Sequence, residues 1–357
     1  MTETDTRIAI MVAITREYEL LKKAMDESDS HAVVKIGHRD FLLGKLHGIN
    51  VVVAMSNPGK VAAAVTATLM VKCFSAAAVI FVGIAGATGA GVRVGDVIVA
   101  KGLVQHDLDV RPFYKITELP SPHRKTHLVP TESLTDTAVP VTATLMVKCF
   151  SAAAVIFVGI AGATGAGVRV GDVIVAKGLV QHDLDVRPFY KITELPSPHR
   201  KTHLVPTESL TDTAVRAVKT FIDEKYHSVI SDKLIEDLGL ADPVLREGTI
   251  ATGDQFISSD DMKKKVIENV PDALCVEMEG ASVAQVCVEL ETPYCVIRIV
   301  SDSSDGSGHA DFEKFASGVA SELTYGVVDI MLGEFGEEII KSVGSVKKRA
   351  AVGKELL

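Results

Sequence analysis

The sequence predicts an α/β fold with three layers, in which helices cover both faces of a central, mixed and mostly parallel twisted sheet. Apolar runs of strand length alternate with segments of helical spacing along most of the chain, which is typical of this class. Several runs are apolar throughout, as in strands that are buried on both faces. The 357 residues, 47% of them apolar, suffice for one or two domains with a large core.

The N-terminal part begins with an apolar run, followed by helical spacing of apolar residues over 17–25. Gly-His and His-Gly pairs then separate three short strands. An alanine-rich helix starts after Pro58 and Gly59 and runs to about residue 74. The strands predicted in this part are residues 7–14, 31–36, 41–46, 49–54, 77–82 and 94–100.

The C-terminal part shows the same alternation. Residues 232–242 are predicted to form a surface loop or a short helix. Ser259 is a candidate cap of a helix at 258–270, because a serine oxygen accepts hydrogen bonds from the first helical amides. A long amphipathic helix is predicted over 311–332, and the tail 334–357 is expected to be a solvated, frayed helix. The strands predicted here are residues 248–251, 273–276 and 293–300.

The chain contains an exact internal repeat. Residues 65–139 recur without a mismatch as residues 141–215, with Pro140 between the two copies. A solenoid is excluded, because it needs at least about three diverged units. A sheet has one position for each strand, so identical copies compete for it. We therefore expect a single domain over residues 7–333, with one copy partly looped out.

The two copies keep different flanking sequences. Residues 60–64 run directly into the helix of the first copy, whereas residues 207–215 of the second copy run directly into the helix that continues at 216. In the first copy Pro140 interrupts the equivalent helix, where proline is poorly tolerated. We expect the first copy to supply the entering helix and its strand, and the second copy to supply the late helix.

Composition excludes several classes of partner. The net charge is −9, which argues against nucleic acid, because phosphate binding needs a basic face. Glycines interrupt the uncharged stretch between Lys72 and Arg93, which favours a buried strand and a turn over a membrane-spanning helix. His106, Asp107 and Asp109 resemble a metal cluster, but no second histidine lies at ligand spacing. Neither a metal nor another cofactor is expected.

Two features indicate a cytoplasmic protein. The N-terminus is acidic and polar and does not resemble a secretory signal. The five cysteines form no CxxC pair and lie in apolar surroundings, as free thiols of a reducing compartment do. They are Cys73, Cys149, Cys275, Cys287 and Cys295.

Acidic side chains follow three of the predicted buried strands. Glu17 follows the first strand, Glu277 and Glu279 follow the strand at 273–276, and Asp302 follows the last strand. In a parallel sheet such strand ends meet at one cleft. Carboxylates gathered there without an obvious positive cluster suit general acid–base chemistry, because their proton affinities are shifted apart.

Each of these residues also has a purely structural interpretation. Glu17, Glu277 and Glu279 could be helix acids that interact with the helix dipole. Asp302, with the preceding serine, could cap a helix. The glycine turn at 83–86 lacks the GxGxxG pattern and the acid of a dinucleotide site, so Rossmann-type binding is disfavoured.

Several motifs occur in a fixed order along the chain. They are Gly59-Lys-Val-Ala-Ala-Ala, Gly83-x-Ala-Gly, Gly95-Asp-Val, His106-Asp-x-Asp-Val, Gly253-Asp-x-Phe-Ile, Val276-Glu-Met-Glu and Ser301-Asp. With them the sequence resembles the 5′-methylthioadenosine/S-adenosylhomocysteine nucleosidases, in the purine nucleoside phosphorylase-like superfamily. The resemblance covers about residues 7–332, apart from one repeat copy.

The resemblance implies roles for the acids. Glu17 would be the general base that helps to activate the attacking water. Asp302 would be the general acid that protonates adenine N7, with Ser301 beside it. Glu279 would accept hydrogen bonds from the ribose hydroxyls. Glu277 would be held, together with the water, by Arg298.

The resemblance also implies the walls of a pocket. Met278 would pack under the sugar, Phe256 would stack on the purine, and the backbone of Ile257 would read the adenine edge. The remaining positions surround the substrate and its 5′-alkylthio group. They are Ile14, Ile84, Ala85, Gly86 and Phe312, with Phe113, or its twin Phe189, reaching across the interface of a homodimer.

The implied activity is hydrolysis of the N-glycosidic bond of 5′-methylthioadenosine or S-adenosylhomocysteine, with release of adenine and a 5-thio-substituted ribose. A carboxylate at position 17 would repel phosphate, so water is the favoured nucleophile. Arg16 departs from the acidic pattern that is common in this turn, so a phosphate-dependent nucleoside phosphorylase remains an alternative. A catalytically impaired nucleoside-binding protein is the other alternative, because the repeat could disrupt the cleft.

Overall fold

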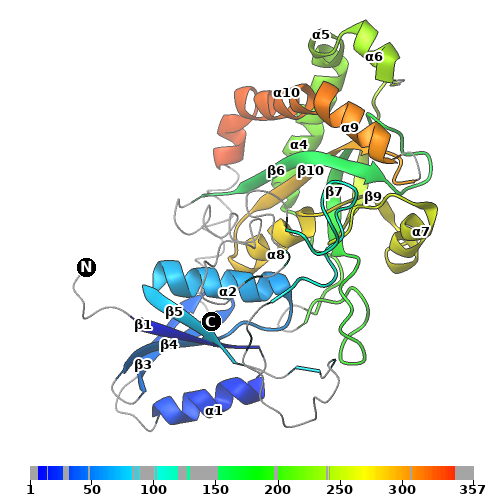
Figure 1. The fold of residues 1–357 in the computed structure, drawn as a ribbon. Coiled ribbons are helices and arrows are strands. Elements are labelled where there is room, and N and C mark those ends of the chain that lie inside the picture. Colours follow the sequence, from blue (N-terminus) through cyan, green and yellow to red (C-terminus); the bar gives the residue numbers. More distant parts are fainter. Residues whose placement is uncertain are drawn as a thin grey trace. The chain divides into compact units, whose positions relative to one another are not determined.

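The chain forms two compact units in the computed structural model. Unit 1 comprises Met1–Cys149 with Pro196–Pro198, and unit 2 comprises Phe150–Leu195 with His199–Leu357. Both units combine strands with helices, and the predicted α/β class is confirmed. Figure 1 shows the elements in sequence colours. The structure describes residues 7–13, 15–26, 32–46, 49–82, 85–86, 88, 100, 103–119, 126, 128, 152–196, 200–238, 240, 242–305 and 308–341.

Unit 1 contains an open sheet in the order β2-β3-β4-β1-β5. Strand β1 pairs in parallel with β4 and β5, whereas β2, β3 and β4 pair antiparallel. The strands are β1 (Arg7–Val12), β2 (Ala32–Ile36), β3 (Arg39–Leu46), β4 (Ile49–Met55) and β5 (Ala76–Phe81). These strands were predicted, and the strand predicted at 94–100 lies outside the described residues except for residue 100.

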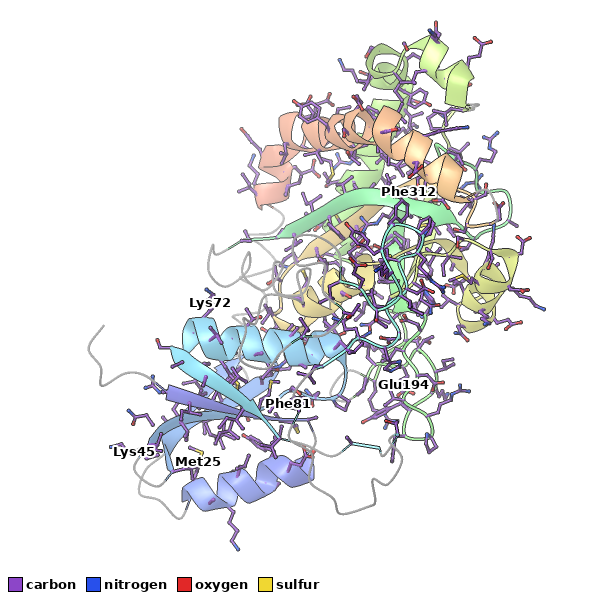
Figure 2. The ribbon with its side chains drawn as sticks, in the orientation of Figure 1. Met25, Lys45, Lys72, Phe81, Glu194 and Phe312 are labelled. Carbon is purple, nitrogen blue, oxygen red and sulfur yellow. The ribbon has the colours of Figure 1, made fainter. Side chains whose placement is uncertain are left out.

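Helices α1 (Thr15–Asp26) and α2 (Lys60–Cys73) lie on opposite faces of this sheet (Figure 1). Successive side chains of a strand point to opposite faces. Val51 and Val53 of β4 accordingly pack with Met25 of α1, which is completely buried (Figure 2). Val52 and Ala54, which are also completely buried, point to the other face. Alternation of this kind fixes the register of β4.

The strands of unit 2 close into a barrel in the order β10-β6-β9-β8-β7. Strand β10 pairs in parallel with β6, and β8 pairs in parallel with β7 and β9. The strands are β6 (Val155–Ala163), β7 (Val173–Gln181), β8 (Leu245–Thr252), β9 (Ala273–Glu277) and β10 (Tyr294–Asp302). The strands predicted after the repeat are confirmed, and β8 is longer than the predicted 248–251.

Helices α4 and α10 bury the main core of unit 2 against β7 and β10, with Phe221 and Val327 among its completely buried residues. The single helix predicted over 311–332 is wrong, because the chain bends by 55° between two helices. Gly318, a poor helix former, precedes the break. The helices of this unit are α4 (Glu208–Thr220), the π-helical turn η2 (Phe221–Lys225), α5 (Tyr226–Val229), α6 (Asp232–Leu238), α7 (Asp260–Asn269), α8 (Gly280–Glu289), α9 (Gly308–Gly318) and α10 (Ala320–Gly333).

Both repeat copies form the same strand, but they use opposite edges of it. In the first copy the N–H of Val82 donates to Met11 O of β1 at 3.0 Å. In the second copy the N–H of Val155, the twin of Val79, donates to Pro293 O at the start of β10, at 2.9 Å. Peptide groups three residues apart point to opposite edges of a strand. One sequence therefore has one edge that fits β1 and another that fits β10.

Candidate active site

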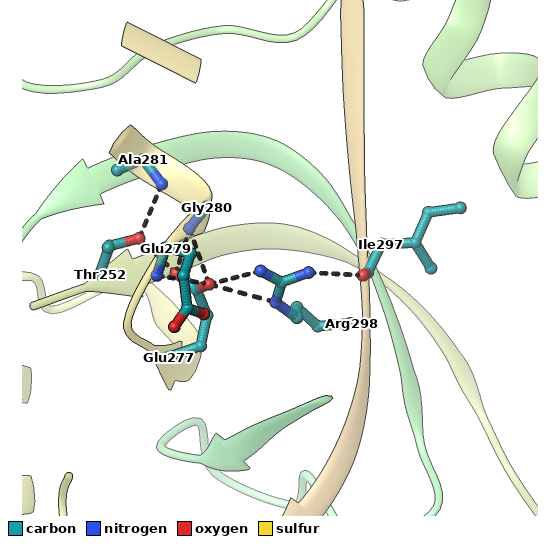
Figure 3. Close-up of polar contacts among 7 residues, drawn as sticks. All are labelled: Thr252, Glu277, Glu279, Gly280, Ala281, Ile297 and Arg298. Carbon is teal, nitrogen blue, oxygen red and sulfur yellow. Dashed lines mark hydrogen bonds and ion pairs between the residues drawn. The ribbon is translucent and has the colours of Figure 1, made fainter. Parts of the chain in front are cut away.

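Glu277 lies at the C-terminal end of β9 and is the centre of a buried polar network (Figure 3). Its carboxylate accepts hydrogen bonds from Arg298, at 2.5 Å from Nη2 and 3.2 Å from Nε. It also accepts from the backbone N–H groups of Glu279 at 3.0 Å and Gly280 at 2.7 Å, and from the Thr252 hydroxyl. Because both oxygens are satisfied inside the protein, Glu277 anchors the turn into α8.

The ion pair between Glu277 and Arg298 is almost completely dry. Their side chains are 3% and 1% exposed, respectively. The guanidinium carbon of Arg298 also lies 4.2 Å from the centre of the Phe157 ring, a cation–π contact with β6. Removal of one charge would leave the other buried and unpaired, which is strongly destabilising. Arg298 therefore fixes the position of Glu277.

Glu279 differs from Glu277, although only one residue separates them. Its carboxylate does not cap α8, and a backbone hydrogen bond with Met278 favours the ionised form. Burial, together with the negative charge of Glu277, raises the pKa of Glu279 to about 7. Glu279 is therefore partly ionised near neutral pH. A carboxylate accepts hydrogen bonds, which suits a ligand that presents hydroxyl groups.

Asp302 is the last residue of β10 and is 2% exposed. Its Oδ2 accepts a hydrogen bond from the Ser301 hydroxyl at 2.8 Å, and its Oδ1 accepts from the N–H of Ser304 at 2.8 Å. A methyl group added at Gly162 would lie 2.8 Å from Asp302 Oδ1 and 2.0 Å from Ser304 Oγ. A side chain at position 162 would therefore displace the Asp302 or Ser304 side chain, which the two hydrogen bonds hold in place.

Gly162 brings the acids of β9 and β10 to one place. It pairs with Asp302 on one side and with Val276 on the other. Val276 directly precedes Glu277 and its turn. The end of β6 is therefore flanked by Asp302 and by the segment that carries Glu279.

Aromatic and apolar side chains lie on the adjoining elements. Phe256 follows β8, and its ring meets that of Phe312 edge to face, with centroids 5.5 Å apart. Phe312 belongs to α9 (Figure 2). Ile257 is buried in a cluster formed with strands β7 to β9. Met278 is half-buried in the turn between the two glutamates. Phe256 and Phe312 thus form an apolar contact between the segment after β8 and helix α9.

The structure does not bring all predicted site residues into unit 2. Glu17 belongs to unit 1, where it lies in the first turn of α1 and its Oε2 accepts the N–H of Ala13 at 3.2 Å. Ile14 and Ile84 lie outside the described residues. Phe113 is half-buried in unit 1, and its twin Phe189 in unit 2 is 81% exposed.

The predicted glycine turn occurs twice, and the two copies have different surroundings. Ala85 and Gly86 of the first copy are exposed, and a methyl group added at Gly86 would have no neighbour within 4 Å. The equivalent of Gly86 in the second copy is Gly162, which touches Asp302. The reason is that β6, and not β5, pairs with β10.

Two polar residues of this region had no role in the sequence prediction. The hydroxyl of Thr252, at the end of β8, donates to Glu277 and accepts the N–H of Ala281 at 2.8 Å, which links two strands to α8. His182 follows β7 and is 5% exposed. Thr252 ends β8 and His182 directly follows β7. A position at a strand end was the signal that pointed to the acids, and it applied equally to these two residues.

The structure also bears on metal sites and membrane-spanning helices. Among the residues that the structure describes, no group of three or more His, Cys, Asp or Glu side chains could hold a metal ion. Within the same residues no single helix is long and apolar enough to cross a membrane. The bent pair Phe312–Gly318 and Ala320–Gly333 meets that criterion by length and composition only.

Comparison with known families defines the class of protein. Residues 7–139 and 135–332 match the model of the Phosphorylase superfamily. The chain belongs to this superfamily.

Individual relatives are nucleosidases. A 5′-methylthioadenosine/S-adenosylhomocysteine nucleosidase of Haemophilus influenzae is 30% identical over 49% of this chain and 69% of the relative. An aminodeoxyfutalosine nucleosidase of Campylobacter jejuni is 35% identical over 48% of this chain and 66% of the relative. A solved Neisseria meningitidis 5′-methylthioadenosine/S-adenosylhomocysteine nucleosidase has a TM-score of 0.45 and 25% identity, covering 92% of this chain and 98% of that structure. The resemblance inferred from the motifs is confirmed.

Proposed function

We propose that this protein hydrolyses the N-glycosidic bond of nucleosides of the 5′-methylthioadenosine and S-adenosylhomocysteine type, releasing adenine and a 5-thio-substituted ribose. The relatives are named nucleosidases, in agreement with the predicted class of enzyme, a purine nucleosidase. One observation carries the proposal. The buried Asp302 and the segment that carries Glu279 flank the same strand end, at Gly162.

Asp302 is proposed as the general acid. Cleavage of the N-glycosidic bond places negative charge on the leaving base, and a proton delivered to N7 neutralises it. The hydrogen bonds of Ser301 and Ser304 to the carboxyl group support a fixed direction of delivery. Glycosidases likewise use an oriented carboxyl group to protonate the leaving group.

Glu279 is proposed to bind the ribose. The sugar gains positive charge as the bond breaks, so a carboxylate near its hydroxyls stabilises the transition state more than the ground state. Met278 would pack under the sugar, and Phe256 and Ile257 would hold the purine, with Phe312 beside the 5′ substituent. The edge-to-face contact of the two phenylalanines supports a common apolar surface.

Glu17 is proposed as the general base for water. A phosphate nucleophile would be repelled by its carboxylate, which favours hydrolysis over phosphorolysis. Ile14 keeps its predicted role in the pocket. The role predicted for Ile84, Ala85 and Gly86 passes to their second-copy equivalents, because a methyl group added at Gly162 would meet Asp302.

The setting of the enzyme is also a proposal. We expect a homodimer in which Phe113 or Phe189 closes the pocket of the other subunit, and the 81% exposure of Phe189 supports a role at an interface. Residues 7–333 would form the nucleosidase-like domain, with one repeat copy partly displaced and 334–357 as a tail. The free, buried thiols support the predicted cytoplasmic location, since they persist in reducing compartments. They are Cys275, Cys287 and Cys295.

Adenine release tests this function directly. The protein is incubated with 5′-methylthioadenosine, with and without phosphate, and adenine is quantified. We expect release without phosphate, and a loss of at least about 100-fold in Asp302→Asn, which cannot donate the proton. Asp212→Asn is the matched control, because Asp212 is 62% exposed. Release only with phosphate, or full activity of Asp302→Asn, would contradict the proposal.

A further inference from the structure

The ring of His182 lies against the backbone of Gly253. A methyl group added at Gly253 would lie 2.1 Å from His182 Nε2 and 2.8 Å from each neighbouring ring carbon. Such distances are far below van der Waals contact, so a side chain at position 253 would force the His182 ring to shift. The imidazole therefore determines how close the chain after β8 comes to β7.

Backbone contacts tie the same two segments together. The N–H of His182 donates to Thr252 O at 2.9 Å, and the N–H of Gly253 donates to Glu277 O at 3.0 Å. The next residue is held as well, because the N–H of Asp254 donates to the Asp183 carboxylate at 2.7 Å. The segment that leads to Phe256 and Ile257 thus starts from a fixed point.

His182 Nε2 is buried and has no hydrogen-bond partner among the residues that the structure describes. A buried polar atom without a partner is unfavourable, and a carbon ring in its place would avoid that penalty. Polar groups that persist at such a cost are functional candidates. This observation is independent of the packing against Gly253.

We propose that His182 is a positioning residue, whose imidazole fixes the segment 253–257 and thereby sets Phe256 and Ile257 for a purine base. The inference rests on the proposed function, from which the purine is taken. Proper placement of binding groups is worth large factors, since a displacement of about 1 Å can lower activity about 100-fold.

The repeat supplies an internal control for this role. His106 has the same neighbours in sequence as His182, but it is exposed. The following residue, Asp107, forms an ion pair with Lys60 at 2.9 Å, whereas Asp183 binds the segment after β8. Only the second copy therefore has the contacts that the proposal requires.

A neutral imidazole is consistent with the packing of the His182 ring against Gly253. Burial lowers the pKa of His182, and the carboxylates that face it, Asp183 and Glu277, oppose this effect only in part. The imidazole is consequently neutral near pH 7, and it packs against Gly253 without a counter-charge.

A size exchange between the two residues tests the proposal. We compare Gly253→Ala, His182→Ala, the double variant and His106→Ala, by calorimetric binding of adenine, by KM and kcat of adenine release, and by Tm. Each of the first two variants is expected to weaken adenine binding and raise KM about 10-fold, with kcat changed less than about 3-fold. The double variant should recover to within about 3-fold of the wild type, because loss of the ring makes room for the methyl group.

The outcomes separate this inference from the proposed function. Adenine binding that follows the expected pattern, without any adenine release by the wild type, would refute hydrolysis and support the role of His182. Normal release together with unchanged binding in His182→Ala would overturn the role and leave hydrolysis intact. An additive loss in the double variant, an equal loss in His106→Ala, or no adenine binding by the wild type would also overturn it.

Discussion

The two copies of the repeat have one sequence and two environments. Short-range features are the same in both: Asp109 accepts the N–H of Arg111, and Asp185 accepts that of Arg187. Long-range features differ, because Leu103 is 53% exposed and its twin Leu179 is completely buried. Local structure is thus set by neighbours in sequence, and burial is set by the strands that each copy meets.

The difference is greatest at the strand that both copies form. In the first copy it lies at the edge of the unit 1 sheet as β5, with Phe81 58% exposed (Figure 2). In the second copy it is enclosed in the barrel as β6, and the equivalent Phe157 packs on Arg298. One strand could pair with β1 through one edge and with β10 through the other. In this chain the repeat distributes these two pairings over β5 and β6.

The largest difference between the two repeat copies is expected at the equivalent residues Gly162 and Gly86. Gly162→Ala places a methyl group against Asp302 and Ser304, so we expect a loss of activity of about 100-fold and a destabilisation of about 1–3 kcal/mol. Gly86→Ala meets nothing within 4 Å and should change neither quantity measurably. The rate of adenine release and the free energy of unfolding, measured by chemical denaturation of the two variants, test this expectation. Equal effects in both would show that the copies have the same surroundings.

Deletion of one copy sharpens the comparison further. Removing residues 65–140 leaves 357 − 76 = 281 residues, with one strand to pair with both β1 and β10. Since the edges used in the two copies are opposite, both pairings are compatible. Glu17 and Asp302 would then follow the two neighbours of one strand, and we expect activity to rise about 10-fold.

Adenine release per mole of chain, with a single thermal transition, checks the deletion. A shortened chain that folds and is less active than the full chain would contradict the expectation. A shortened chain that fails to fold would show that the strand cannot serve both neighbours.

The smallest effect is expected at the aspartates after the two histidines. Asp183→Ala removes the acceptor of the Asp254 N–H and should cost about 1 kcal/mol. Asp107→Ala removes a half-exposed ion pair with Lys60 and should cost less than about 0.5 kcal/mol. Denaturation midpoints of both variants measure the difference. A larger cost for Asp107→Ala would reverse the assignment of the two copies.

Much of the fold was predictable from the sequence, because apolar runs and helical spacing are local signals. The cap at Ser259 is an example, since its side chain accepts the N–H of Met262 as expected. The bend after Gly318 was missed, because continuous apolar spacing hid the break. The distribution of strands over two sheets depends on which copy each strand meets, and identical sequences carry no information about that choice.

The site was predictable to a similar extent. Strand ends indicated Glu277, Glu279 and Asp302, but only the structure shows that Glu277 is paired with Arg298 while burial raises the pKa of Glu279. His182 is the second-copy twin of His106, and the sequence indicated that histidine only as a possible metal ligand. Its importance derives from contact with Gly253, which is 71 residues away in sequence and leaves no local pattern.

The exposed edge of β5 has a consequence for handling the protein. Ile80, Phe81 and Val82 are 49%, 58% and 51% exposed, and β5 is the last strand of its sheet. Peptide groups along such an edge add strands from other molecules, and the apolar side chains strengthen the addition. We expect chains to associate edge to edge through β5 at high concentration, and Phe81→Lys should suppress this association without changing the barrel.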